Sequence, residues 1–473
     1  MVPTKRELFI RQQYIAVTSI KIILLILLGS ILVHLINTPV SRFIFYGMLA
    51  LYLIRSKDST VDIALVFIFL AHPFYLFNSE PFSWFVMITQ SVGFSFSLVF
   101  VLVILLKYLF IHPSKISLRK DLLKSFYLPV FVYLVFLLFW SLVFGHSARS
   151  LFFIVSFLPS FLLFLVLPKI FNIDQLYYFN GIVFFVNLIH ISVSQSDIIL
   201  GGRITDFLVL GKINAQAIFE DDEVVRLTGG ILIALYSFVT GLYYITIGTR
   251  RFNSGYLWII VFVSLLFIMN SATRGWMIAS GVFLLLFLVY YYNKITYRRL
   301  FIAIIFTVIA VYILLPGKIK SNLIASFRRL STVEYVFEGD LTAGGTARRF
   351  DIRGPQVLTR FKESPFFGFG FSKVSADYYD GHVGNHNLLL VGGIVGFILF
   401  WATVLGIVLY LLRLEGNNIR FKGVFVFGIA MLSIMIIHST SRTMVSFYMP
   451  SDVSFLIAVM FNNINAQYYN NNG

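Results

Sequence analysis

Ser-Pro-Phe-Phe-Gly-Phe-Gly (364–370) and Gly-His-Val-Gly-Asn-His-Asn (381–387) lie at the centre of the stretch around which this chain is organised. The stretch begins with Ala-Arg-Arg-Phe-Asp-Ile-Arg (347–353) and runs into Leu-Leu-Leu-Val-Gly-Gly-Ile-Val-Gly (388–396), the head of an apolar segment. Nearly everything before it is apolar enough to lie in a bilayer. The sequence therefore sets a polar region rich in Arg, His and Gly at the mouth of a predicted bundle of membrane helices. Such a place is suited to chemistry on an anionic, lipid-linked substrate.

The composition excludes an ordinary soluble protein. Of the 473 residues, 59% are hydrophobic and only 12% are charged, which is more apolar surface than a soluble chain of this size could cover with polar groups. The chain has no cysteine, so a disulfide, a Cys-ligated zinc and a Cys nucleophile are all excluded. We attribute the net charge of +16 to cytoplasmic connections and anionic lipid, and we expect no nucleic-acid partner.

Apolar runs predict an all-α polytopic membrane protein with about 12–14 transmembrane helices, at roughly 20 residues per span. Residues 1–315 are expected to hold about 11 of them, with a periplasmic loop at 196–226. Residues 316–386 form a long periplasmic loop carrying the site, and residues 387–473 form the C-terminal helices. The runs are 14–36, 42–54, 60–78, 84–110, 126–145, 150–168, 175–195, 227–247, 255–271, 275–293, 300–315, 387–412, 423–440 and 452–463.

The distribution of Lys and Arg predicts the orientation of the chain. With the N-terminus in the cytoplasm, the short inner connections hold 19 basic residues, Lys107 among them, and the short outer connections hold 7. Because cytoplasmic loops carry the excess of Lys and Arg, we expect both termini in the cytoplasm. The seven outer residues are Arg42, Arg149, Arg203, Lys212, Arg226, Arg274 and Arg442.

The long loop at 316–386 contains enough aromatic residues to pack rather than to remain disordered. We expect amphipathic helices in it, around 320–331 and 347–363, lying on the outer membrane surface.

Three outer arginines are candidate phosphate ligands, because a guanidinium forms bidentate, permanently charged hydrogen bonds. Arg274 lies between two predicted spans with almost no loop to keep it in water. The alternative for Arg274 is a residue at a helix end that reaches back to the interface. Arg203 and Arg226 lie in or beside the loop at 196–226, and ordinary loop charges remain the alternative for both.

His382 and His386 are four residues apart, a spacing that on a helix could hold a metal ion. Gly381 and Gly384 argue against a helix there, so we assign no metal site. A neutral His can instead accept a proton or donate to phosphate, and a capping role is the alternative. The acidic run at 220–223 is interpreted as a solvated patch rather than a cation site.

Taken in order, four segments resemble the O-antigen polymerase (Wzy) and O-antigen ligase (WaaL) superfamily. They are Ser-Ala-Thr-Arg-Gly-Trp (271–276), Arg-Arg-Phe-Asp-Ile-Arg (348–353), Ser-Pro-Phe-Phe-Gly-Phe-Gly (364–370) and His-Asn-Leu-Leu-Leu-Val-Gly-Gly-Ile-Val-Gly (386–396). The resemblance covers roughly residues 200–400; the first six spans match only in hydropathy.

The resemblance implies a GT-C-like glycosyltransferase of the bacterial inner membrane, taking a glycan from undecaprenyl diphosphate at the periplasmic face. It implies neither metal nor cofactor. Arg274 corresponds to the arginine that binds the diphosphate and His386 to the proposed base or phosphate partner. Either Arg203 or Arg226 corresponds to the upstream arginine. Thr273 replaces the usual Ser, and His382 could share the role of His386.

Further basic residues are expected to position the substrate. Arg348 and Arg349 are the next candidates after Arg274, followed by Arg353.

The motifs do not separate a polymerase, which extends a second lipid-linked repeat unit, from a ligase, which uses lipid A-core. We favour the polymerase, with a chain-length regulator considered as a further partner. The alternative of another class is a transporter or flippase of lipid-linked oligosaccharide, for which internal repeats and polar groups deep in the membrane would be expected.

Overall fold

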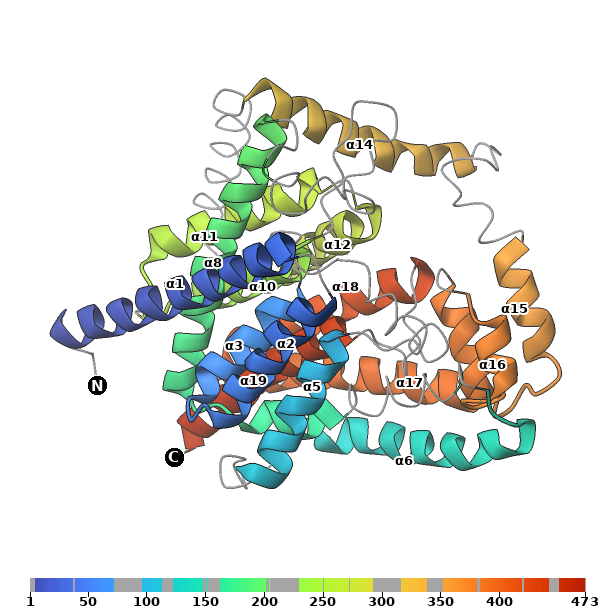
Figure 1. The fold of residues 1–473 in the computed structure, drawn as a ribbon. Coiled ribbons are helices and arrows are strands. Elements are labelled where there is room, and N and C mark those ends of the chain that lie inside the picture. Colours follow the sequence, from blue (N-terminus) through green and yellow to red (C-terminus); the bar gives the residue numbers. More distant parts are fainter. Residues whose placement is uncertain are drawn as a thin grey trace.

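The computed structural model describes residues 5–36, 39–71, 96–112, 122–147, 150, 162–200, 204, 229–249, 251–271, 273–291, 316–337, 352–380, 383–418, 421–441 and 451–472. Within these ranges every regular element is a helix (Figure 1). The α-helices are α1 (Lys5–Ile36), α2 (Pro39–Arg55), α3 (Ser59–Leu70), α5 (Phe96–Leu106), α6 (Lys124–Trp140), α8 (Ile173–Ile199), α10 (Ile231–Ile247), α11 (Ser254–Asn270), α12 (Arg274–Tyr291), α14 (Gly317–Phe337), α15 (Gly354–Phe361), α16 (Lys373–Tyr378), α17 (Gly384–Asn417), α18 (Phe425–Ser441) and α19 (Ser451–Asn472).

Among the described residues, five helical segments are long and apolar enough to cross a membrane. Shorter apolar helices, including α3, α10 and α11, accompany them. The predicted all-helical, multi-pass class is confirmed at this level. The predicted span at 300–315 lies outside the described residues. The five segments are Ile10–Gly29, Lys124–Phe144, Ile173–Ile199, Arg274–Tyr291 and Gly384–Asn417.

The loop at 316–386 contains helices close to the two predicted positions. The structure has α14 where a helix around 320–331 was expected, and α15 within the expected 347–363. In Figure 1, α14 lies along the top of the bundle, and α15 and α16 lie at its right.

Polar contacts group the helix ends at one end of the bundle. Asp174, at the start of α8, accepts from Arg251 (2.8 Å) and lies 3.5 Å from Arg11 of α1. The hydroxyl of Tyr291, the last residue of α12, donates to Glu415 near the end of α17 (2.8 Å). The start of α18 joins this end, because the backbone N–H of Phe425 also donates to Glu415 (3.0 Å).

A second set of contacts forms what we call the Asn270 end, after the last residue of α11. The Asn270 side chain donates to Gln195 of α8 (2.9 Å), and Asn322 of α14 donates to both the backbone and the side-chain oxygen of Asn270 (3.0 and 2.9 Å). Lys318 donates to the carbonyl of Ile199 at the end of α8 (2.9 Å). Helix α14 is thus fastened across the ends of α8 and α11, beside the start of α12.

Lys107 is not the loop charge that the sequence predicts. It begins a π-helical turn (Lys107–Ile111) directly after α5 and is fully buried. Its ammonium donates to the carboxylate of Asp62 and to the carbonyls of Leu53 and Ser56, and the Tyr108 hydroxyl also donates to Asp62 (3.1 Å). The side chain therefore satisfies carbonyls at the end of α2, where intrahelical partners run out. Hydropathy alone could not distinguish this buried pair from a loop charge.

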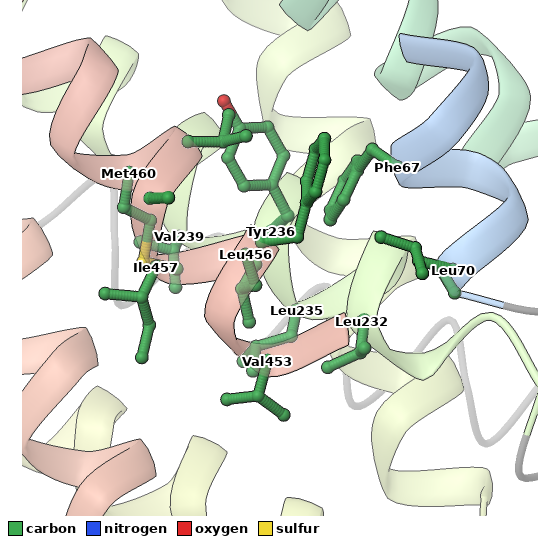
Figure 2. Close-up of a cluster of buried hydrophobic side chains, with 14 of the residues drawn as sticks. Phe67, Leu70, Leu232, Leu235, Tyr236, Val239, Val453, Leu456, Ile457 and Met460 are labelled. Atoms are coloured by element: carbon green, nitrogen blue, oxygen red, sulfur yellow. The ribbon is translucent and has the colours of Figure 1, made fainter. Parts of the chain in front are cut away.

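The interior around α3, α10 and α19 is apolar on almost every side. All but one of the residues of α3 are buried, as expected for a helix that is hydrophobic on every face beyond its first turn. Figure 2 shows Phe67 of α3 beside Tyr236 of α10, with Leu456 and Met460 of α19 in the same cluster. The Tyr236 hydroxyl donates to Asn180 of α8 (2.6 Å), which ties a further helix to the cluster.

Candidate active site at a broken helix

Helix α17 is interrupted at Gly393. This residue has φ 62° and ψ −170°, a non-helical conformation in a segment of 34 residues. The indole of Trp401 donates to the side chain of Asn385 at 3.4 Å, although sixteen residues of straight helix would span about 24 Å. Residues 384–392 therefore fold back against residues 394–417. The sequence predicts one continuous span at 387–412, and this part of the prediction is wrong.

The Ser-Pro-Phe-Phe-Gly-Phe-Gly loop (364–370) fills the break. A broken helix leaves backbone donors and acceptors without intrahelical partners, and the loop supplies them on both sides of Gly393. The four hydrogen bonds run from Phe369 N–H to Leu390 O (2.8 Å), from Gly370 N–H to Val391 O (2.9 Å), from Ile394 N–H to Pro365 O (2.8 Å) and from Val395 N–H to Phe366 O (3.1 Å). Two of the four segments that carry the family resemblance, 364–370 and 386–396, are thus joined by backbone hydrogen bonds.

The loop lies so close to α17 that a side chain cannot be added at its central glycine. Gly368 has φ +64°, and a Cβ there would lie 2.5 Å from Leu390 O and 2.6 Å from the carbonyl of Val391. The Pro-x-x-Gly-x-Gly pattern is explained by this close backbone approach, for which Gly is the fitting residue.

Helix α6 supports the loop and the break from one side. The Tyr133 hydroxyl donates to Gly392 O (2.5 Å), and the indole of Trp140 donates to Gly368 O (3.0 Å). The ring of Phe367 packs edge-on against Phe136 and Trp140, with centroids 5.3 and 5.7 Å apart. We call the end of α6, residues 353–370 with α15, residues 373–380 with α16, and residues 384–392 the re-entrant unit. It has a small core of its own, formed by Val357, Phe369, Val383 and Leu390.

His386 lies in the first turn of α17, within the re-entrant unit. Its side chain is half-buried. The expectation that glycines exclude a helix here is wrong for His386, because α17 begins at Gly384. The imidazole is therefore held in the first turn of a helix, with part of its side chain exposed.

Arg353 belongs to the same unit. It precedes α15 and lies 3.6 Å from the carboxylate of Asp380, with both side chains partly exposed. Asp380 is in turn bonded through its backbone to Asn387, the neighbour of His386. Among the candidates in the described residues, Arg353 and His386 are connected indirectly, through Asp380 and Asn387.

Arg274 belongs to another helix. It begins α12 at the Asn270 end and is half-buried, with its Nε atom inaccessible to solvent. Helix α12 packs on α18, and α18 packs on α17. The predicted division of work between Arg274 and His386 stays a prediction.

Several candidates lie outside the described residues: Arg203, Arg226, Arg348, Arg349, His382 and the acidic run at 220–223. In the part of the chain that is described, no three His, Asp or Glu side chains are grouped as metal ligands.

The sequence interpretation missed Asp380, Asn387 and Tyr133. Asn387 was part of a quoted motif, but nothing in the sequence indicated that its partner would be the backbone of Asp380. Tyr133 had no signal of its own, because it lies in an apolar run rich in aromatic residues.

Comparison with protein-family models gave no match, and no curated protein matches the sequence. The class defined by the described residues is therefore a helical, multi-pass membrane protein with a re-entrant unit at a broken helix.

Proposed function

We propose that this protein is a metal-independent glycosyltransferase that takes a glycan from a polyprenyl diphosphate and transfers it to a second lipid-linked repeat unit. The observation that carries the proposal is the meeting of residues 364–370 with residues 386–396 at the break in α17. Within the second stretch, Asn387, the neighbour of His386, bonds to the backbone of Asp380, whose carboxylate lies 3.6 Å from Arg353. The proposal also rests on the resemblance to the O-antigen polymerase and ligase superfamily.

The chemistry assigns separate tasks to the basic residues and the histidine. The acceptor hydroxyl attacks the anomeric carbon, the bond from that carbon to the diphosphate breaks, and the lipid diphosphate leaves. Arginines stabilise the charge that develops on the leaving oxygen, an effect of about 3 kcal/mol for one such donor. His386 takes the proton of the acceptor hydroxyl, which contributes roughly 10²–10⁴-fold in rate. One in-line displacement inverts the anomeric configuration.

The proposal places the Asn270 end and the re-entrant unit on the periplasmic side of a bacterial inner membrane, with the end that carries Asp174 in the cytoplasm. This chain has no cysteine, so single cysteines can report the sides. A cysteine at Lys318 should react with an impermeant thiol reagent in cells with a permeabilised outer membrane, and one at Asn417 should not. The reverse pattern would invert the proposed orientation.

A transporter of lipid-linked oligosaccharide is the second candidate, and the broken helix favours it, because transporters commonly build substrate sites from discontinuous helices. The two candidates differ in covalent chemistry. In proteoliposomes with labelled lipid-linked oligosaccharide, a transporter moves the label across the bilayer with the glycan unchanged, whereas the proposed enzyme lengthens the glycan.

Deleting the gene tests the cellular role. A surface polysaccharide reduced to single repeat units supports the polymerase. Free lipid-linked polymer together with bare core would identify a ligase instead, and an unchanged polysaccharide ladder would refute both.

A further inference from the structure

The side chain of Asn387 holds one residue at two points. Its Oδ1 accepts from the backbone N–H of Asp380 (3.2 Å), and its Nδ2 donates to the backbone carbonyl of Asp380 (2.5 Å). Asn387 itself is completely buried. A carboxamide has one acceptor end and one donor end, so this pairing uses both and fixes the peptide on each side of Asp380 to the first turns of α17.

Asp380, held in this way, forms an ion pair with Arg353. Its carboxylate lies 3.6 Å from the guanidinium, and the two side chains are 26% and 38% exposed. An ion pair this open contributes little to stability. It is nevertheless suited to holding a guanidinium in place while leaving the other N–H groups to an incoming anion, because Arg carries five donors.

Asn385 provides an internal comparison. It lies two residues before Asn387 on the same helical turn, and its side chain accepts from Trp401 within α17. Asn385 thus braces the two halves of α17, whereas Asn387 ties α17 to the segment that carries Asp380. The same residue type makes two distinguishable connections.

We infer that Asn387 is a positioning residue that places Arg353, through Asp380, on the same side of the site as His386, where Arg353 receives an anionic group of the lipid-linked substrate. This inference rests on the proposed function for the identity of the anion, a diphosphate. It adds Asp380 and Asn387 to the residues on which donor binding depends, although neither touches the donor.

A distance measurement tests, without any substrate, whether the side chain of Asn387 holds the segment that carries Asp380. We call this pairing the Asn387 clamp. Cysteines introduced at Asp377 of α16 and Ile398 of α17, both exposed, carry spin labels whose separation reports the position of the Asp380 segment. We expect one narrow distance distribution in the parent chain and in Asn385→Ala, and a broadened one in Asn387→Ala. A narrow distribution in Asn387→Ala would overturn the inference.

Binding of undecaprenyl diphosphate to the purified protein in micelles tests the second step. Asn387→Ala, Asp380→Asn and Arg353→Gln should each raise the dissociation constant about tenfold, the effect of losing one charged hydrogen bond. Asp380→Asn keeps the Asn387 clamp and should retain the narrow distance, so it remains informative if Asn387→Ala folds poorly. Conversely, unchanged affinity in Asp380→Asn would overturn the inference.

A double-mutant cycle separates positioning from general damage. Asn387→Ala should add no further loss of affinity to Arg353→Gln, whereas losses from Asn385→Ala should add to it in full. Additive losses for the Asn387 pair would contradict action through Arg353. A parent protein that neither binds the diphosphate nor transfers a glycan would instead refute the proposed function. The spin-label distances would still show whether Asn387 holds the Asp380 segment in place.

Discussion

Replacing Gly393 by Ala should damage the re-entrant unit even though Ala is the better helix former. In a regular helix interior this substitution stabilises by up to about 1 kcal/mol. Gly393 has φ 62° and ψ −170°, a region that is essentially restricted to Gly and costs other residues about 1–3 kcal/mol. A decrease in the free energy of unfolding on Gly393→Ala therefore indicates a broken helix at this position, and an increase indicates a continuous one.

The structure also supplies a steric contribution. A Cβ at Gly393 would lie 2.5 Å from Phe367 N and closer still to the carbonyl of Phe366, and these are backbone atoms that cannot rotate away. The loop would have to withdraw, breaking the bonds from Ile394 N–H to Pro365 O and from Val395 N–H to Phe366 O. At about 1 kcal/mol net for each hydrogen bond, the two contributions sum to about 3–5 kcal/mol.

Gly416→Ala is the matched control in the same helix, because a Cβ there meets nothing within 4 Å. Equilibrium unfolding in mixed micelles, followed by Trp fluorescence, gives the stability difference. Hydrogen exchange gives its location, since the N–H groups of Phe369 and Gly370 donate to α17 and should exchange faster only in Gly393→Ala. A Gly393→Ala protein as stable as Gly416→Ala, with both amides still protected, would refute the broken-helix account.

Further predictions concern other parts of the chain. Lys107→Met should destabilise by about 3–5 kcal/mol because it leaves Asp62 as a buried, unpaired charge; the same unfolding assay checks this, and a neutral result would contradict the buried pair. Asn322→Ala should loosen α14 from Asn270, and unchanged hydrogen exchange along α14 would show that this anchor is unimportant. Arg274→Lys should leave transfer strongly impaired, since Lys lacks the bidentate fork; near-normal polymer formation at matched expression would remove Arg274 from the site. His386→Ala should lower kcat with little change in donor affinity if the imidazole is the base, and equal losses in both would make it a phosphate ligand instead.

The apolar helices were predictable from hydropathy because their apolar runs are bounded by polar residues. Helix α14 was predictable for a different reason, since basic and apolar residues alternate along it in a helical period. The break in α17 was not predictable in this way. Its only local signal is Gly392-Gly393, and glycines are common in unbroken membrane helices.

The candidate site was predictable in its motifs but not in its connections. His386 was selected because His can move protons near neutral pH, and Arg353 because guanidinium groups bind phosphate. Their link runs through the backbone of Asp380 and the buried amide of Asn387. Side-chain contacts to backbone leave no residue-type signature in a single sequence, so this link emerged only from the fold.

The central claim is that the re-entrant unit catalyses glycosyl transfer from a lipid diphosphate, and a reaction with purified components tests it most directly. The protein in proteoliposomes is given a lipid-diphosphate-linked repeat unit, and the glycan products are separated by length. The account predicts a ladder of polymer with the parent chain, and a ladder reduced at least a hundredfold in rate with His386→Ala, in keeping with the loss of a general base. Equal ladders from the two proteins, or unchanged single repeat units from the parent chain, would contradict it.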